Sequence, residues 1–414
     1  MAAEVIAYEV PPSAQAARRL RVVVALALAA LVPLLIGRSD WAVTWVFGLA
    51  FGWIIQRSRF CFASAFRDLF LLRDGSMLRA VLIGMAIAVP GFLLAMYNLG
   101  PSIGAGRYPL GASVMPIGIH TLFAGFVFAI GMIVAGGCFS GTLYRMGEGY
   151  VASWVTMGGI LIGFLALGYT WSFWWDFSYT RSISVWFPHG LGWSGAGVLT
   201  LALIALTYVA VLWWESRAGQ TFEWEEPKEE DAPGLRSRLE GLARRAFFKP
   251  WPIVGAAIAL GGLNALFYLF DHPWGVTVAG YQWMESLSGL FGISPEELKG
   301  LADLGTACNP TAPGTDRILG LSDHTMINAG LIVGAFAASS IAGDFKVRLP
   351  QLKRRYVQSL GGGILMGYGS GLALGCTLGA FFSAIPSLAL NGWGFGLGLL
   401  VGAYVGVKLI RRLG

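Results

Sequence analysis

The chain alternates between long apolar stretches and short polar connections over almost its whole length. Ten of these stretches approach the roughly 20 residues that an α-helix needs to cross a bilayer. Apolar runs of this length with few charges predict membrane-spanning helices. We therefore predict an all-α membrane protein with about ten spans. They lie at about 22–36, 41–55, 77–97, 116–136, 150–170, 193–214, 252–270, 324–343, 357–375 and 391–410.

The composition supports this interpretation. Hydrophobic residues make up 56% of the 414 positions and charged residues 13%, whereas a soluble domain has about 25% charged residues. The chain has 58 Gly and 16 Trp, which suit close helix packing and anchoring at membrane interfaces. There is no GxxxxGK[ST] motif for ATP. We therefore expect no enzymatic activity, no cofactor and no metal, and a lipid bilayer as the surroundings.

The positively charged loops predict the topology, because Lys and Arg are retained on the cytoplasmic side. The same rule assigns the net charge of +6 to topology, so we expect no nucleic-acid partner. Segments 57–79 and 346–355 are rich in basic residues, and the Trp-rich segment 171–192 has one Arg. We predict a cytoplasmic tail at 1–21 and a cytoplasmic linker at 215–250, with both termini in the cytoplasm of a bacterium and the spans in its inner membrane.

The chain also divides into two similar halves, 22–170 and 193–414, on either side of the external segment 171–192. Each half contains a GCxxG sequence, at 137–141 and at 375–379. Five spans per half force the second half to insert upside down. Inverted repeats are typical of transporters and place the substrate near the midplane of the membrane. Gly-rich helix faces also suggest a homodimer.

Four cysteines lie in segments too short to span, at 57–72, 136–149, 301–319 and 375–386. We predict a helix break before the cysteine and a short helix after it, whose free N–H groups attract an anion. Thiols add a soft, weak donor that suits a sulfur or selenium atom. A lone buried Cys usually serves packing alone, but the matched GCxxG contexts favour function. The predicted substrate-binding residues are Cys61, Cys138, Cys376, Cys308, Gly137, Gly375, Ser140 and Thr377.

Other polar residues near these segments have simpler interpretations. We predict local ion pairs between Arg67 and Asp68 and between Arg145 and Glu148. His120 and His324 start spans and are expected to be solvated at an interface, and we predict that His189 and His272 are loop residues. None of these residues is expected to bind the substrate.

The cysteine segments resemble the YeeE/YedE family of sulfur-transport membrane proteins. The resemblance implies thiosulfate uptake through constrictions lined by Cys61, Cys138 and Cys376, with a TusA-like sulfur-carrier protein as cytoplasmic partner. Cys308 is additional to that pattern and no TusA-like domain is fused to the chain, so related sulfur oxyanions and selenium compounds remain alternatives. The matching sequences are QRSRFCFASAFRD at 56–68, AGGC at 135–138 with YR at 144–145 and EG at 148–149, and LGC at 374–376 with AFF at 380–382 and IP at 385–386.

Two other functions use the same cysteines. A membrane thiol oxidoreductase would form a disulfide during turnover, but the chain has no CxxC pair and its cysteines are predicted on two faces. A soft-metal carrier would gather Met and His around the cysteines, and the sequence does not do so. Uptake of a small sulfur-containing anion, thiosulfate first, is therefore the leading hypothesis.

Overall fold

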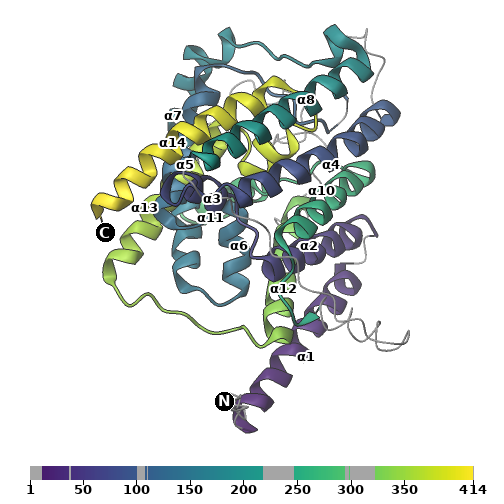
Figure 1. Ribbon diagram of the computed structural model, residues 1–414. Coiled ribbons are helices and arrows are strands. Elements are labelled where there is room, and N and C mark those ends of the chain that lie inside the picture. The colour runs from purple at the N-terminus through teal and green to yellow at the C-terminus, as the bar shows by residue number, and fades with distance from the viewer. Residues whose placement is uncertain are drawn as a thin grey trace.

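The protein is a bundle of long helices with shorter helices inside it (Figure 1). The computed structural model describes residues 12–36, 39–99, 108–109, 111–217, 247–293, 298 and 322–413. Within these ranges there is no β-strand beyond isolated bridges, so the predicted all-α class is confirmed. The elements are α1 (Pro12–Ile36), α2 (Ser39–Ser58), α3 (Phe62–Leu71), α4 (Ser76–Leu99), α5 (Ile119–Ala135), α6 (Phe139–Gly147), α7 (Val151–Phe177), η2 (Tyr179–Arg181), α8 (Pro188–Ser216), α10 (Ile253–Phe270), α11 (Thr277–Leu290), α12 (Asp323–Ala342), α13 (Lys353–Leu372), η4 (Thr377–Ser383) and α14 (Leu390–Leu413).

Every predicted span coincides with a helix, but not every helix meets the requirements of a span. Among the described residues, seven helical stretches are long and apolar enough to cross a membrane. They contain α4, α5 with α6, α7, α8, α10, α12 and α14. α13 and η4 meet at a 47° bend and together would make an eighth. The total of ten spans therefore stays a prediction.

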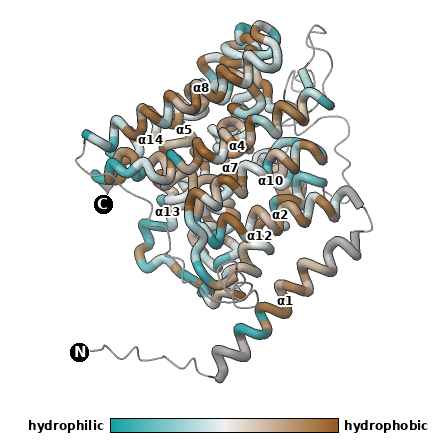
Figure 2. The backbone as a smooth tube through the Cα atoms, turned by 45° about the vertical axis from the view of Figure 1, so that its right-hand side comes forward, coloured by the Kyte–Doolittle hydropathy of each residue, from teal (hydrophilic) through white to brown (hydrophobic). Residues whose placement is uncertain are grey.

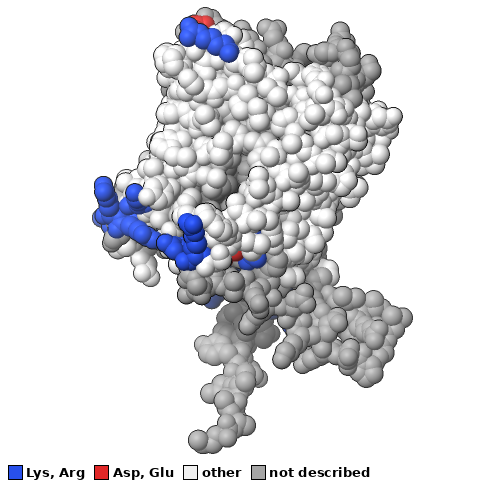
Figure 3. Space-filling view, turned by 45° about the horizontal axis from the view of Figure 1, so that its top comes forward, with Lys and Arg blue, Asp and Glu red and all other residues white. Residues whose placement is uncertain are grey.

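The outer surface of the bundle is apolar. Figure 2 shows hydrophobic residues along the long helices and hydrophilic residues at their ends and connections. On the face in Figure 3, charged side chains gather towards two opposite ends, with a broad uncharged area between them. Large apolar side chains such as Val198, Leu206 and Val209 of α8 point outwards. Because water would disfavour such a surface, the protein is a multi-pass membrane protein.

Small residues let the helices approach closely. α13 packs against both α5 and α7, and α14 packs against α5. At the α5–α13 crossing, a Cβ atom on Gly131 would lie 2.6 Å from the carbonyl oxygen of Gly362. α2 packs against α12 and α4 against α10. In a lipid environment such close van der Waals packing is a principal source of helix association.

The short helices α3, α6 and η4 lie inside this framework. Every residue of η4 is buried, and so is every residue of α6 except Arg145. Most of the predicted linker 215–250 and the whole segment around Cys308 lie outside the described residues. The other three cysteine segments are described in full.

Candidate functional site

Three cysteines each lie directly before a short buried helix. Cys61 precedes α3, Cys138 precedes α6 and Cys376 precedes η4, and each occupies the N-cap position. All three are free thiols with at most 2% of their surface exposed. The predicted short helices after these cysteines are therefore present. The fourth, Cys308, lies outside the described residues, so its assignment stays a prediction.

The helix breaks before Cys138 and Cys376 occur at the predicted positions. The backbone conformation that produces the break differs between the two. α5 ends at Gly136, whose φ of +82° is a left-handed conformation that glycine adopts without strain. The second break places the positive φ on Leu374. Gly375 is needed there for space, because a Cβ atom on it would lie 2.8 Å from the backbone nitrogen of Ala380. Gly137 likewise leaves room for Arg145, whose Nη1 would lie 3.0 Å from a Cβ at that position.

The first thiol pair joins α3 to α6. The Sγ atoms of Cys61 and Cys138 both lie beside Gly141 of α6. The Cys138 Sγ also accepts a hydrogen bond from the Gly141 N–H at 3.4 Å and lies 3.4 Å from the Ser140 Oγ. A methyl group on Gly141 would lie 3.3 Å from both sulfur atoms. The GCxxG sequence thus positions a thiol, a hydroxyl and a helix N-terminus together, which is a suitable environment for an anion.

The third thiol pairs with a hydroxyl instead of a thiol. Cys376 accepts a hydrogen bond from the Leu378 N–H at 3.3 Å and faces the side chain of Thr277 at the start of α11. Among the described residues, the Oγ1 atoms of Thr277 and Thr377 are buried without a well-formed hydrogen bond. A buried hydroxyl in that state costs about 1–3 kcal/mol. Both hydroxyls are therefore available to a ligand beside Cys376.

Aromatic rings connect the two pairs. The residue after Cys61 is Phe62, whose ring centroid lies 5.5 Å from that of Phe382 in η4. The residue after Cys138 is Phe139, which packs against Gly280 of α11, where a Cβ atom would lie 2.6 Å from the Phe139 Cζ. Each helix that carries a thiol of the first pair thus contacts an element of the second pair. Apolar contacts therefore join the two pairs.

A cavity of about 390 Å³ reaches the break before Cys138. Its lining includes Gly136, Gly137 and three arginines, Arg145, Arg348 and Arg355, and no acidic side chain. The cavity lies on the side predicted to face the cytoplasm, because the basic segment 346–355 forms part of its wall. Its charge favours anions, and Gly137 in its lining directly precedes Cys138.

Several polar neighbours differ from the sequence predictions. Arg67 and Asp68 form the predicted ion pair, at 2.8 Å. The predicted pair of Arg145 with Glu148 is wrong, because Arg145 donates to the carbonyl oxygen of Gly136 at 2.5 Å, while Glu148 accepts from Gln56 Nε2 at 3.0 Å. Because α6 begins at Phe139, Arg145 lies over the end of α5. There it binds the Gly136 carbonyl oxygen, which has no partner within the helix, instead of the Glu148 carboxylate.

The prediction of solvated histidines is also wrong. His120 is buried, and its Nδ1 lies 2.8 Å from the Ser178 Oγ. His324 is buried against His272. In both cases the start of the helix is covered by other parts of the chain, which a linear hydropathy pattern does not report.

Comparison with known proteins shows the family of this chain. A family model described as sulphur transport matches residues 57–405. The thiosulfate transporter TsuA of Spirochaeta thermophila is 28% identical over 84% of this chain and 92% of its own length. TsuA of Escherichia coli is 27% identical over 84% of this chain and 88% of its own length. The probable transporter YedE of Escherichia coli is 33% identical over 39% of this chain and 38% of its own. The chain belongs to the YeeE/YedE family of sulphur-transport membrane proteins.

Proposed function

We propose that this protein takes up a small sulfur-containing anion, most readily thiosulfate, across the bacterial inner membrane into the cytoplasm. The observation that carries the proposal is the set of three buried free thiols, each at the N-terminus of a short helix inside a membrane bundle. The relatives named as thiosulfate transporters support the choice of substrate. In this proposal the protein is a transporter or channel and forms no lasting bond with its cargo.

The chemistry of the path follows from its groups. A divalent oxyanion gains from helix N–H groups and hydroxyls at the thiols, and from the guanidinium of Arg145 beside the break before Cys138. A thiol provides a weak donor and a polarisable atom for the terminal sulfur of thiosulfate. The arginine-lined cavity then attracts the ion towards the cytoplasm, where a TusA-like carrier protein would collect it. Weak contacts in series allow the ion to enter and to leave.

The helix packing supports an inverted repeat. Suppose that α1 to α7 correspond in order to α8, α10, α11, α12, α13, η4 and α14. Each contact between two helices should then have a counterpart between the two corresponding helices. The α7–α13 contact becomes the α14–α5 contact, and α2–α12 becomes α10–α4. The contact of α1 with α12 becomes that of α8 with α4, and α3–α14 becomes α11–α7. All these contacts are present, as expected for a transporter with an internal two-fold relation.

This correspondence assigns a role to Thr277. Thr277 is the first residue of α11, the counterpart of α3, and faces Cys376. Cys61 lies directly before α3 and beside Cys138. We infer that Thr277, rather than Cys308, takes the place of Cys61 in the second half. The path then has two stations, Cys61 with Cys138 and Thr277 with Cys376, separated by the apolar rings of Phe62 and Phe139.

Replacing Thr277 by valine tests the second station. Thr277→Val keeps the shape of the side chain and removes the hydroxyl, so we expect uptake to fall about tenfold, the equivalent of about 1.4 kcal/mol. The abundance of the protein should not fall, because the lost hydroxyl has no well-formed partner. Thr200→Val is the matched control, since that buried hydroxyl donates within its own helix to the Ala196 carbonyl oxygen at 2.9 Å. Equal uptake by the two variants would remove Thr277 from the path.

Growth on thiosulfate tests the function itself. We expect this chain to restore growth, with thiosulfate as sole sulfur source, to a bacterium that lacks its thiosulfate and sulfate importers. Uptake of labelled thiosulfate should saturate, and unlabelled thiosulfate should compete better than sulfate or selenite. Failure to restore growth by a chain that is abundant in the membrane would reject thiosulfate. Stronger competition by a selenium compound would make that compound the substrate.

One observation favours a second function, a membrane thiol oxidoreductase. The Sγ atoms of Cys61 and Cys138 would both lie 3.3 Å from a Cβ atom on Gly141, so the two thiols are close neighbours, as a disulfide requires. Thiol alkylation followed by mass measurement, before and after transport, distinguishes the two functions. A transporter keeps all its thiols reduced, whereas an oxidoreductase accumulates a Cys61–Cys138 disulfide when its electron acceptor is present.

A further inference from the structure

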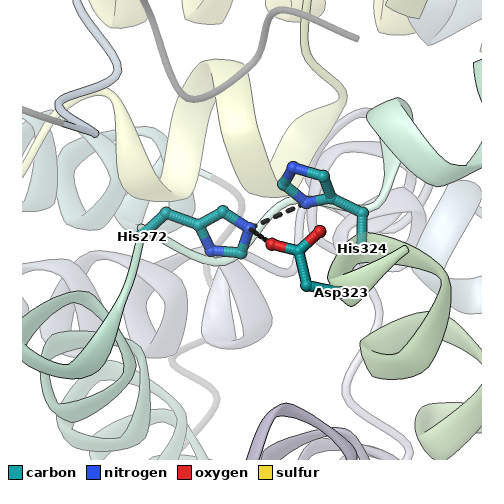
Figure 4. Close-up of side chains that lie close together, drawn as sticks. All are labelled: His272, Asp323 and His324. Atoms are coloured by element: carbon teal, nitrogen blue, oxygen red, sulfur yellow. Dashed lines mark hydrogen bonds and ion pairs between the residues drawn. The ribbon is translucent and has the colours of Figure 1, made fainter. Parts of the chain in front are cut away.

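Two histidines and an aspartate converge near the start of α12 (Figure 4). His272 lies in the connection between α10 and α11, whereas Asp323 and His324 begin α12. α12 has 20 residues, so its rise of 1.5 Å per residue separates this cluster from the basic segment after α12 by about 30 Å. The cluster therefore lies apart from the basic segment that lines the arginine-lined cavity.

The three side chains direct their ligand atoms at one point. The His272 Nε2 lies 2.7 Å from the His324 Nδ1 and 3.9 Å from the Asp323 Oδ2. One potential ligand atom from each residue lies within 4.8 Å of the others. Ligand atoms 2.0–2.1 Å from a tetrahedral zinc ion are about 3.3 Å apart. The two observed distances bracket that value, and each differs from it by about 0.6 Å.

The protonation of the pair also fits a metal. Between two neutral imidazoles in contact, one ring nitrogen must donate and the other accept. A divalent cation can bind both facing lone pairs when each ring carries its single proton on the other nitrogen, His272 on Nδ1 and His324 on Nε2. The neighbouring Asp323 carboxylate supplies a third, negatively charged ligand, and a water molecule can fill the fourth position, as in zinc sites with three protein ligands.

The surroundings supply an outer shell and an entrance. The His272 Nδ1 is buried without a hydrogen bond, and the Asp271 Oδ2 lies 3.9 Å from it. Metal-bound histidines commonly donate their second ring N–H to such a carboxylate, which orients the ring. Both imidazoles are buried, while the Asp323 side chain keeps 27% of its surface exposed. An ion can thus arrive from the solvent at Asp323 and reach the histidines behind it.

We propose that His272, Asp323 and His324 bind one divalent transition-metal ion, with Zn²⁺ as the first candidate. The ion joins the α10–α11 connection to the start of α12. α11 begins at Thr277, five residues after His272, so the metal holds the segment that leads to the Thr277–Cys376 station. Its binding stabilises the folded protein, because an unfolded chain does not offer the preformed site.

Metal titration of the purified chain tests this proposal. The protein is purified in detergent, its affinity tag is removed, and bound metal is stripped with a chelator. We expect it to bind one Zn²⁺ per chain and to unfold at a higher temperature in its presence. His272→Ala and His324→Ala should each weaken Zn²⁺ binding by at least about tenfold. Replacing a residue that only hydrogen-bonds to a metal ligand already lowers metal affinity by about that factor. Asp271→Asn should weaken it less. His189→Ala replaces an exposed histidine on α8 and is the matched control.

Co²⁺ distinguishes this site from the cysteines. Bound to two imidazoles and a carboxylate, Co²⁺ should give the visible absorption of a tetrahedral ion without the strong charge-transfer band of a thiolate ligand. A thiolate band, absence of stoichiometric binding, or unchanged affinity in both His→Ala variants would overturn the proposal. His324→Gln keeps a polar side chain at the buried position, so it tests binding should His324→Ala fail to fold. None of these measurements depends on thiosulfate transport.

Discussion

Replacing Cys138 by alanine should reduce thiosulfate uptake about 10- to 150-fold, and replacing Cys61 should have a similar effect. Cys138 is fully buried, receives the Gly141 N–H and contacts both Ser140 and Cys61. Its removal leaves the anion with one soft partner instead of two at the first station. A hydrogen bond to a charged group contributes about 1.5–3 kcal/mol, and each 1.4 kcal/mol is tenfold. The measurement is the initial rate of uptake of labelled thiosulfate, normalised to protein in the membrane.

Cys138→Ser separates two explanations of the same loss. Serine keeps a small hydrogen-bonding group at the N-cap, so the short helix should still begin at Phe139. If softness of the sulfur matters, uptake by Cys138→Ser should stay close to that of Cys138→Ala. Full uptake by the serine variant would mean that hydrogen bonding alone is sufficient. Undiminished uptake by Cys138→Ala would remove this thiol from the path altogether.

Local signals in the sequence were sufficient to predict the short helices. Gly136 and Gly375 interrupt helices because of their own conformation or size, and each cysteine after the break acts as the N-cap of the next helix. Long apolar runs likewise determine where helices form, since a lipid-facing helix must be apolar on its own account. These features need no knowledge of distant parts of the chain.

Contacts between distant segments could not be predicted in this way. Thr277 resembles any threonine at the start of a helix until α11 is placed beside η4. His272 and His324 are 52 positions apart, and each alone has the pattern of a residue at a membrane interface. Arg145 has a carboxylate three residues away at Glu148, yet it binds the carbonyl of Gly136 because the break turns α6 back over α5. Such partners are decided by packing, which periodicity does not encode.

The second glycine of the first GCxxG sequence, Gly141, should be as important as the cysteines. Gly141→Ala places a methyl group 3.3 Å from the sulfur atoms of both Cys138 and Cys61, tighter than a comfortable contact, so one thiol must shift by a few tenths of an ångström. Overpacking of this kind costs about 1–3 kcal/mol. We expect thiosulfate uptake to fall about tenfold or more, because the methyl group occupies the space between the thiols that the substrate must use.

The same substitution should not reduce the amount of folded protein by the same factor. Alanine favours a helix interior over glycine by about 0.8–1.0 kcal/mol, and this gain offsets part of the steric cost. Gly158→Ala is the matched control, since a Cβ atom there meets no other atom within 4 Å and the residue also lies within a helix, α7. Thiosulfate uptake by the Gly158→Ala variant and its abundance in the membrane should both match those of the unmodified chain. If Gly141→Ala transports as well as Gly158→Ala, the space between Cys61 and Cys138 is not part of the route, and the two thiols would have to serve packing instead.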